Sequence, residues 1–270
     1  MRKYYPASAS FDSNSPNLRP LTPYSYPGGR VPVLAPIAWS NDWPTIQTTN
    51  GRWSPTYTYP AAKHTLDLTT GKDTFPGTSL GPAWEWNHNP DPSKYNIFNG
   101  LTLSTATVTS DLYAARNTLT KRIYGPVGTG TLELDVANMA DGDRAGLALL
   151  RDQSAWVGVK RDGPEWSVCY ANNMVMNGDW TTRTTGDMVA CTAISAGAKI
   201  WLRLTADIAP GGSKKARFYY STDGSGFRQI GGEFGMNTAW QFFMGYRYGI
   251  FNYATKGLGG SVQVDSFTSE

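Results

Sequence analysis

Leu132-Glu133-Leu134-Asp135-Val136-Ala137 and Trp201-Leu202-Arg203-Leu204-Thr205-Ala206-Asp207-Ile208 are the two stretches that decide the fold. In the first, Leu and Val alternate with Glu, Asp and Ala, and in the second Leu, Ala and Ile alternate with Trp, Arg, Thr and Asp. Successive side chains of a strand point to opposite faces of a sheet, so a period of two indicates a strand with one buried face. Both stretches therefore predict half-buried β-strands.

Turn signals separate the alternating stretches along the rest of the chain. Asx-Gly pairs occur at Asn99-Gly100, Asp141-Gly142, Asp162-Gly163, Asn177-Gly178 and Asp223-Gly224. Such pairs supply the positive φ angles that tight hairpins require. Helical periodicity does not extend beyond two turns anywhere, so the sequence predicts an all-β chain, an antiparallel two-sheet sandwich or jelly roll.

Composition narrows the class of partner. The chain has 270 residues, a formal charge of +3 and only 17% charged residues, without a Lys/Arg-rich run. This argues against a nucleic-acid binder, and the short apolar stretches fall far below the roughly 20 residues of a membrane span. The 10 Trp, 15 Tyr and 10 Phe instead suggest a protein that handles a flat, hydroxylated ligand.

Residues 1–74 differ from the rest of the chain. They are rich in Pro, Ser, Thr and Tyr, lack sustained periodicity, and predict an extended N-terminal arm before a sandwich over residues 75–270. Within the arm, Arg30–Ile37 is an apolar stretch interrupted by prolines, which restrict it to an edge or irregular strand. Met1-Arg2-Lys3 is not followed by an apolar signal segment, so we expect either a processed secreted protein or a fragment of a longer one.

The two cysteines, Cys169 and Cys191, can form one disulfide if neighbouring strands bring them together. Sequence alone does not give their distance, so a bridge and two free thiols both remain open. With only two His and two Cys, the chain has few of the side chains that usually bind zinc.

The first candidate binding cluster is Trp84-Glu85-Trp86-Asn87-His88-Asn89-Pro90. An indole can stack on the apolar C–H face of a sugar ring, and Asn or His can hydrogen-bond to sugar hydroxyls. We therefore assign ligand contacts to Trp84, Trp86, Asn87, His88 and Asn89. The alternative is that one or both tryptophans belong to the core.

Two further clusters complete the candidate site. In Asp111–Arg122, the predicted contacts are Tyr113, Arg116 and Asn117, although Arg116 could instead form a structural ion pair with Asp111, Asp141 or Asp143. In Trp240–Tyr253 most residues are predicted to belong to the sandwich core. Tyr248, Asn252 and Tyr253 are the members expected to reach a surface groove.

Catalytic and metal signals are weak. A glycosidase needs two carboxylates about 5–9.5 Å apart. Glu85, Asp143, Glu165 and Asp207 are available, but no spacing singles them out. Asp265 could help to hold Ca²⁺, yet lone carboxylates are usually solvated. We expect no catalytic residue, metal site or cofactor.

The C-terminal three quarters of the chain resembles a known family. Residues 77–90, 111–122, 141–147 and 240–256 match, in order, the C-terminal β-sandwich of glycoside hydrolase family 43 β-xylosidases and α-L-arabinofuranosidases, classified as carbohydrate-binding module family 91. The resemblance implies a concanavalin-like sandwich over residues 75–270. Residues 24–38 resemble the last strand of the family's catalytic propeller, and Trp53–Pro60 resembles the connector that follows it.

The resemblance has a gap that matters for function. The family's catalytic carboxylates come from earlier propeller blades, which residues 1–23 do not match. The sequence thus predicts a secreted, non-catalytic module of hemicellulose degradation that binds xylan or xylo-oligosaccharides, with a family 43 propeller as a possible partner. Two alternatives remain: a hydrolase whose carboxylates lie in the sandwich, and a structural module that packs on the propeller.

Overall fold

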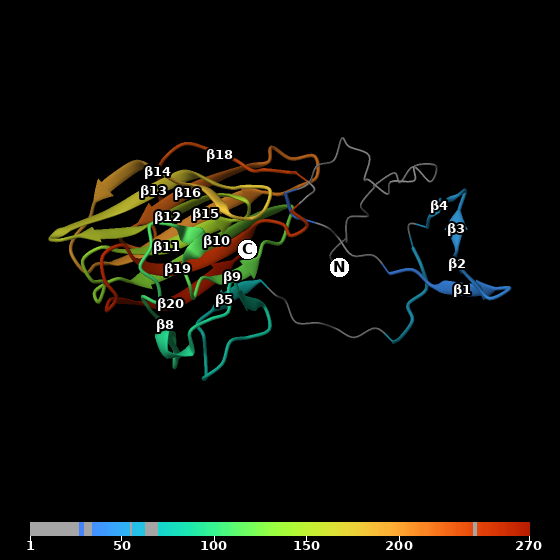
Figure 1. The fold of residues 1–270 in the computed structure, drawn as a ribbon, viewed down its shortest axis with the longest axis horizontal. Helices are drawn as coiled ribbons and strands as arrows, with labels where there is room; N and C mark the ends of the chain where they lie inside the picture. The colour runs from blue at the N-terminus through green and yellow to red at the C-terminus, as the bar shows by residue number, and fades with distance from the viewer. Residues whose placement is uncertain (1–26, 30–33, 55, 63–69, 240–241) are drawn as a thin grey trace. The chain divides into compact units, whose positions relative to one another are not determined.

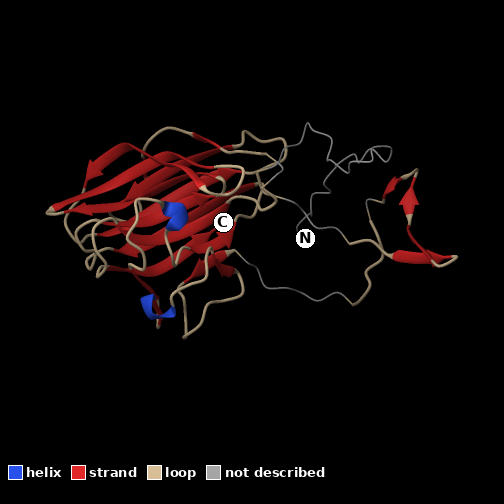
Figure 2. Cartoon of the chain, viewed as in Figure 1, coloured by secondary structure: helices blue, strands red, loops and turns tan. Residues whose placement is uncertain are grey.

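The computed structural model describes residues 27–29, 34–54, 56–62, 70–239 and 242–270. The chain divides into two compact units, one formed by residues 30–68 with residues 1–25, the other by residues 69–270 with residues 26–29. The second unit is a sandwich of two antiparallel sheets (Figure 1) and is almost entirely strand and loop (Figure 2). The predicted all-β, two-sheet fold is confirmed.

The first sheet has nine strands. Its main path runs β17 (Arg228–Gln229), β16 (Lys215–Ser221), β15 (Lys199–Asp207), β10 (Val127–Asp135), β20 (Ser261–Ser269), β8 (Leu101–Ser104) and β7 (Tyr95–Ile97). Two short strands lie off this path: β18 (Phe234–Gly235) pairs with β16, and β5 (Gly71–Asp73) pairs with β20. Because β5 belongs to this sheet, the sandwich begins a few residues before the predicted boundary at residue 75.

The second sheet has seven strands. They run in the order β14 (Thr182–Ala193), β13 (Glu165–Met176), β12 (Gln153–Asp162), β11 (Asp143–Leu150), β19 (Arg247–Ala254), β9 (Leu119–Arg122) and β6 (Trp84–Trp86). Two single-turn 3-10 helices, η1 (Pro92–Lys94) and η2 (Leu112–Ala114), lie in the loops. Asp91 and Asp111 cap them by accepting hydrogen bonds from backbone N–H groups two residues on.

The two stretches that predicted the fold are neighbours in the nine-stranded sheet. Strand β10 pairs with β15 so that Leu132 lies opposite Leu202 and Leu134 opposite Ile200. These four side chains are fully buried in the main core. The core therefore lies between the two sheets, on the faces that the alternation indicated.

The turn predictions hold at most positions. Asn99, Gly100, Gly142, Gly163 and Gly224 all take positive φ angles. The hairpin between β13 and β14 differs, because its left-handed residue is Trp180, with φ of 67°, rather than Asn177 or Gly178. The Trp180 amide donates to the Asn177 carbonyl oxygen at 3.1 Å, so this turn spans residues 177–180, one residue later than a turn centred on Asn177-Gly178.

A second, smaller core covers the outer face of the seven-stranded sheet. Leu112, Tyr113 and Ala115, from the loop around η2, cluster with side chains of that face. The sheet residues of this cluster are Ala148, Leu150, Trp156, Cys169, Ala171, Met174, Phe251 and Tyr253. The seven-stranded sheet is therefore buried on both faces here, which explains why every residue of β11 is buried.

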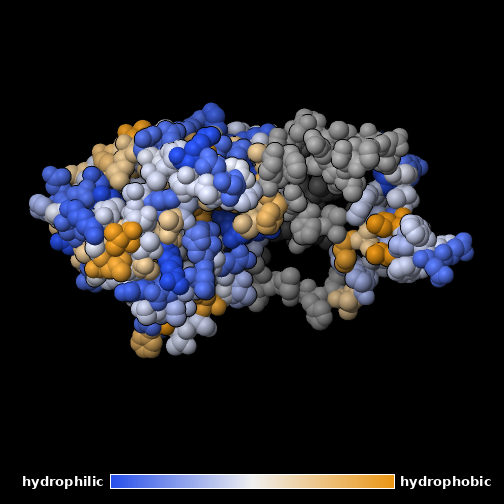
Figure 3. All heavy atoms as spheres, viewed as in Figure 1, coloured by the Kyte–Doolittle hydropathy of each residue, from blue (hydrophilic) through white to orange (hydrophobic). Residues whose placement is uncertain are grey.

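The smaller unit contains a hairpin of β1 (Ile37–Ser40) and β2 (Trp43–Ile46), followed by the short pair β3 (Thr48–Thr49) and β4 (Arg52–Trp53). Every residue of β1 and β2 is exposed, including Ile37 at 59%, Trp39 at 71% and Trp43 at 73%. Hydrophobic, orange atoms are visible on this part of the chain in Figure 3. A lone two-stranded hairpin with exposed apolar side chains is marginal in water.

The predicted propeller remnant at residues 24–38 is only partly visible. Residues 24–26 and 30–33 lie outside the described residues, and the described strand begins at Ile37 rather than within Arg30–Ile37. Residues 27–29 pack on the sandwich: Gly29 pairs with Met244, and the Tyr246 amide donates to the Pro27 carbonyl oxygen at 2.9 Å.

Glycine makes this contact possible. A Cβ on Gly245 would lie 2.2 Å from the Gly28 backbone, and a Cβ on Gly29 would lie 2.2 Å from the Gly245 nitrogen. Gly29 also has a φ of 81°, a region that favours glycine. Two backbones can approach this closely only because neither carries a side chain there.

A disulfide joins Cys169 and Cys191 on the neighbouring strands β13 and β14, which settles the alternative that the sequence left open. Among the described residues, no helix is long and apolar enough to cross a membrane.

Candidate functional site

Trp84 belongs to the core rather than to a binding surface. It is 6% exposed, its Nε1 donates to Asp73 Oδ2 at 2.9 Å, and its ring packs edge-on against Phe267. The Lys121 ammonium lies 5.2 Å from the centre of the Trp84 ring, and burial lowers its pKa. The prediction that Trp84 stacks on a ligand is wrong, and the core alternative is correct.

Trp86 lies on the same face of β6 and is half-buried. It packs against the main core and against Tyr95, with the ring centres 4.6 Å apart. The period of two placed both tryptophans on one face correctly, but that face points into the sandwich.

Tyr113 and Asn117 are structural. Tyr113 lies in the smaller core, and its hydroxyl donates toward the carbonyl oxygens of Asp152 and Met174. Asn117 is 1% exposed, accepts from the Asp91 amide at 2.8 Å and donates to the Asp91 carbonyl oxygen at 3.0 Å. Both side chains hold loops together, which corrects their assignment as ligand contacts.

The three residues assigned from β19 are also buried. Tyr248 lies in the main core against Phe267, and burial raises the pKa of its hydroxyl. Asn252 donates to the Leu103 carbonyl oxygen of the other sheet at 2.7 Å. Tyr253 lies in the smaller core, where burial raises its pKa to about 12. None of the three reaches a surface groove: Tyr248 and Asn252 face the other sheet, and the loop around η2 covers Tyr253 on the outer face.

Three of the assigned residues do converge on the surface. His88, Asn89 and Arg116 line an open, shallow hollow of about 480 Å³, together with Ala106, Thr107 and Ala114. We call this hollow the His88 pocket. It lies where the chain leaves β6 and where the loop around η2 passes beside it, so two segments that are distant in sequence form one surface.

Hydrogen bonds fix the orientation of the polar groups in the His88 pocket. The His88 Nε2–H donates to the Tyr113 carbonyl oxygen, which leaves Nδ1 of the neutral ring as an acceptor. Arg116 Nε donates to the Asn89 carbonyl oxygen at 2.9 Å, and its backbone amide donates to Thr107 Oγ1 at the same distance. No ion pair of Arg116 with Asp111, Asp141 or Asp143 forms, contrary to the structural alternative.

The His88 pocket combines polar groups with small apolar side chains. Its polar groups are an imidazole, an amide, a hydroxyl and a guanidinium, beside the methyl groups of two alanines. The nearby Asp91 carboxylate accepts from the hydroxyl and the amide of Ser93, which holds its pKa below its ordinary value. The residues that line the pocket can donate and accept hydrogen bonds but include no carboxylate.

Asn87 lies on a different hollow. Together with Phe242 and Arg247 it lines a space of only about 30 Å³, which is too small for a sugar ring. Arg247 there donates to Glu85 Oε2 at 2.8 Å and to Thr120 Oγ1 at 3.1 Å.

The four carboxylates considered for catalysis have separate roles and places. Glu85 pairs with Arg247 on the outer face of β6, whereas Asp143 is fully buried at the start of β11. Asp207 accepts from the amides of Ala209 and Ser213, and Glu165 is an exposed residue that begins β13. The four residues thus lie on four different strands, β6, β11, β13 and β15.

Metal ligands are equally scattered over the described ranges. No group of three or more His, Cys, Asp or Glu side chains gathers there as a metal site. Asp265, considered for Ca²⁺, pairs with Lys199 at 2.5 Å.

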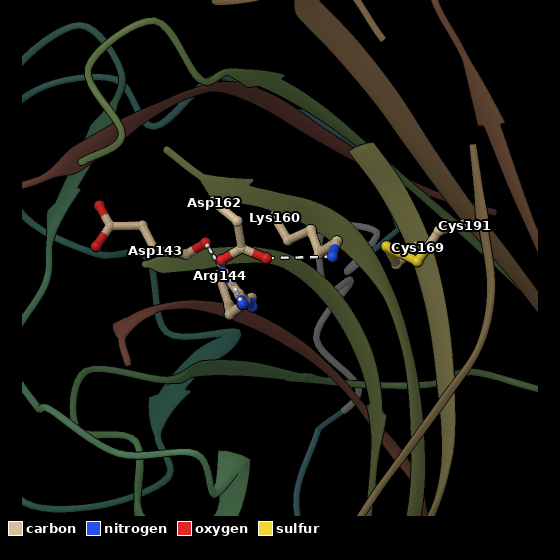
Figure 4. The surroundings of a disulfide bond; sticks show 6 residues. All are labelled: Asp143, Arg144, Lys160, Asp162, Cys169 and Cys191. Atoms are coloured by element: carbon tan, nitrogen blue, oxygen red, sulfur yellow. Dashed lines mark hydrogen bonds and ion pairs between the residues drawn. A yellow bond between two sulfur atoms is a disulfide. The ribbon is translucent and has the colours of Figure 1, made fainter. Parts of the chain in front are cut away.

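A charged cluster lies near the disulfide. Asp162 accepts from Arg144 at 2.8 Å and from Lys160 at 3.1 Å, while the Asp143 carboxylate points away from this group (Figure 4). The Arg144 and Lys160 pairings hold the pKa of Asp162 below its ordinary value, against the effect of burial.

Sequence reasoning missed the exposed aromatic residues. Trp180 is 49% exposed and lies edge-on to Phe242, with ring centres 5.2 Å apart. Phe98 is 69% exposed. Their exposure could have been predicted from their position beside the Asn177-Gly178 and Asn99-Gly100 turns, because side chains at the ends of hairpins project into solvent.

Comparison with known proteins places the sandwich in a family. The sequence profile of the β-xylosidase C-terminal concanavalin A-like domain matches residues 72–270. A β-xylosidase of Formosa agariphila is 27% identical over 269 residues, which cover 89% of this chain and 42% of that protein. A putative β-xylosidase of Xylanibacter ruminicola is 27% identical over 231 residues, or 82% and 39%.

Solved structures agree. One is a family 43 glycoside hydrolase whose active site was engineered to give endo-xylanase and exo-arabinofuranosidase activity. It is 44% identical, with a TM-score of 0.82 over 91% of this chain and 50% of that one. A bifunctional family 43 protein of Bacteroides eggerthii is 31% identical, with a TM-score of 0.75 over 92% and 31%.

The chain belongs to the family of β-xylosidase C-terminal concanavalin A-like domains. It spans half or less of the length of these relatives, and within them the family match corresponds to the C-terminal domain rather than to a whole xylosidase.

Proposed function

We propose that this chain is a secreted, non-catalytic accessory module that binds xylan or xylo-oligosaccharides in the His88 pocket. The observation that carries the proposal is the convergence of His88, Asn89 and Arg116 in one open hollow. The xylosidase relatives support xylan as the polymer, and the Cys169–Cys191 bridge supports an oxidising compartment.

Recognition in this pocket depends on hydrogen bonds more than on stacked rings. Xylose presents hydroxyl groups around a ring with an apolar C–H face. His88 Nδ1, the Asn89 amide and the Arg116 guanidinium can bond to the hydroxyls, while Ala106 and Ala114 contact carbon. An open, wet site of this kind gives weak binding, with a Kd of about 10–1,000 μM.

Titration calorimetry with xylohexaose tests the proposal. His88→Ala and Arg116→Ala should each weaken binding about tenfold, equivalent to about 1.4 kcal/mol. Arg122→Ala is the matched control, because Arg122 is an exposed arginine on β9 that does not line the pocket. Absence of heat together with no retention on insoluble xylan would refute carbohydrate binding here.

A second candidate function, a structural module that packs on a catalytic propeller, is favoured by a different observation. Residues 27–29 are already seated on Met244–Tyr246, and the following hairpin exposes Ile37 and Trp39. Mixing this chain with a family 43 catalytic domain that lacks the corresponding segment should give a stable complex. Ile37→Ser with Trp39→Ser should abolish the complex, whereas Arg116→Ala should not.

A further inference from the structure

An aromatic and cationic surface lies on the outer face of the nine-stranded sheet, away from the His88 pocket. On β15 and β16 the core residues alternate with Trp201, Arg203 and Tyr219, which are half-buried on the outer face. Arg203 lies directly opposite Tyr219, and Tyr219 opposite Gln229 of β17. With the half-buried Phe227, the residues Trp201, Arg203 and Tyr219 form what we call the Arg203 platform.

Arg203 lies over the Phe227 ring of this platform. Its Cζ lies 3.5 Å from the centre of the Phe227 ring, and its Nε donates to Thr131 Oγ1 at 2.8 Å. Stacking on an aromatic ring fixes the guanidinium plane while its outer N–H groups remain directed along that plane.

The other basic side chains of β15 and β16 are each paired with a carboxylate. Lys199 contacts Asp265 and Glu133, and Lys215 and Arg217 both contact Glu233. Glu133 also accepts from Ser266. Over the described part of the sandwich, none of the ion pairs includes Arg203, so its positive charge lacks a protein carboxylate.

The turn beside the platform is pre-organised. Asp223 Oδ1 accepts from the amides of Ser225 and Gly226 and from Ser221 Oγ, and these bonds lower its pKa strongly. Gly224, with a φ of 78°, packs so closely that a Cβ would lie 3.0 Å from the Trp201 ring. The turn therefore fixes the Trp201 ring in place, which reduces the entropy lost when a ligand binds.

We propose that the Arg203 platform binds the carboxylate of a uronic-acid unit attached to a xylan chain. Arginine pairs with a carboxylate through two parallel N–H···O bonds, and a guanidinium that is already held in place loses less conformational entropy on pairing. Trp201 and Tyr219 supply rings on which neighbouring sugar rings can stack. The choice of xylan rests on the proposed function, but the surface and the recognised group are different.

Calorimetry with a matched pair of ligands tests this proposal: neutral xylohexaose, and a xylo-oligosaccharide of similar length that carries one glucuronic acid. The wild type should bind the acidic ligand about tenfold more tightly, and added salt should reduce that preference. Arg203→Gln should remove the preference, and Arg203→Lys should restore part of it. Arg217→Gln, which changes a paired arginine on the neighbouring strand, should leave it intact.

The same titrations separate this proposal from the one on the His88 pocket. In Arg116→Ala the neutral ligand should bind more weakly while the preference for the acidic ligand persists. If neutral xylohexaose does not bind at all, binding of the acidic ligand that depends on Arg203 still supports the platform. Equal affinity for the two ligands, or a preference that survives Arg203→Gln in a folded variant, would overturn it.

Discussion

Arg151 is the residue on which the loop before β19 depends. Its side chain is 1% exposed, and its guanidinium donates to the carbonyl oxygens of Asn237, Ala239, Phe242 and Met244 while pairing with Asp152. Its Cζ also lies 5.2 Å from the centre of the Phe242 ring. One buried side chain thus donates hydrogen bonds to four carbonyl oxygens of this loop.

Arg151→Met should therefore destabilise the sandwich by about 3–5 kcal/mol, because it leaves the half-buried Asp152 carboxylate and four carbonyl oxygens without their cationic partner. Urea unfolding followed by tryptophan fluorescence measures the change. Arg228→Met, at an exposed position of β17, serves as control and should shift stability by less than about 0.5 kcal/mol. Similar effects of the two substitutions would contradict this role of Arg151.

Asp143 should give a distinctive dependence of stability on pH. It is fully buried, one carboxylate oxygen lacks a hydrogen-bond partner, and burial raises its pKa above 3.8. The folded state therefore holds this proton more tightly than the unfolded chain, so its contribution to stability falls as pH rises through this raised pKa.

Asp143→Asn removes that titration and keeps an oxygen that can accept from the Ala140 amide, as Asp143 Oδ2 does at 2.7 Å. The free energy of unfolding of the variant minus that of the wild type should increase as pH rises above 3.8. Other carboxylates are common to both proteins and cancel in the difference. Thermal melts across this range provide the measurement, and a difference that does not change with pH would exclude the effect.

At the scale of elements, the sequence patterns predicted which residues share a face of a strand, but not always whether that face is buried. The alternation in β10 and β15 was sufficient because Leu, Val and Ile mark the core face unambiguously. In β6, the period of two paired Trp84 with Trp86 but could not say whether their face points inward. In β19, both faces are buried because residues 112–115 cover the outer one, and contacts at such sequence distance leave no local signal.

The disulfide stabilises the edge strand β14. Cys169 and Cys191 face each other in the register of β13 and β14 and close a loop with a sequence separation of 22. Cys169→Ala with Cys191→Ala should cost about 3 kcal/mol in the free energy of unfolding. Reduction of the wild type by dithiothreitol should give the same loss. No change in the urea midpoint after verified reduction would refute the expectation.

The glycine contact between residues 27–29 and the sandwich should be sensitive to one methyl group. Gly245→Ala places a Cβ against the Gly28 backbone and should break the bond from the Tyr246 amide to Pro27. Hydrogen exchange of the Tyr246 amide should then accelerate at least about tenfold. Gly232→Ala, where a Cβ meets only open space, should leave that rate unchanged.

At the scale of the whole molecule, the candidate site was predictable only in part. His88, Asn89 and Arg116 were identifiable because they are polar residues in segments that do not alternate with core residues. Ala106 and Thr107 were not, because small side chains become part of a pocket only through the path of the loop. The Arg203 platform was not predictable from the sequence for a related reason: Trp201, Tyr219 and Phe227 lie on separate segments, which only the pairing of the strands brings together.

The exposed hairpin leads to a prediction about association. Ile37 and Trp39 lie on one face of β1, and Pro44 and Ile46 lie opposite them on β2, so one face of the hairpin is apolar. A chain that exposes such a face should self-associate at micromolar concentration when no propeller is supplied. Sedimentation velocity should show this, and Ile37→Ser with Trp39→Ser should restore the monomer. A wild-type chain that stays monomeric would argue against it.

The roof that Leu112, Tyr113 and Ala115 form over Trp156, Phe251 and Tyr253 has a practical consequence for engineering. The outer face of the seven-stranded sheet carries three large aromatic rings, one on β12 and two on β19, and the loop around η2 packs over them. Shortening that loop would turn a sealed interior layer into an open aromatic trough, without any change to the strands. The loop around η2 is thus the segment to redesign if these rings are to be exposed to a ligand.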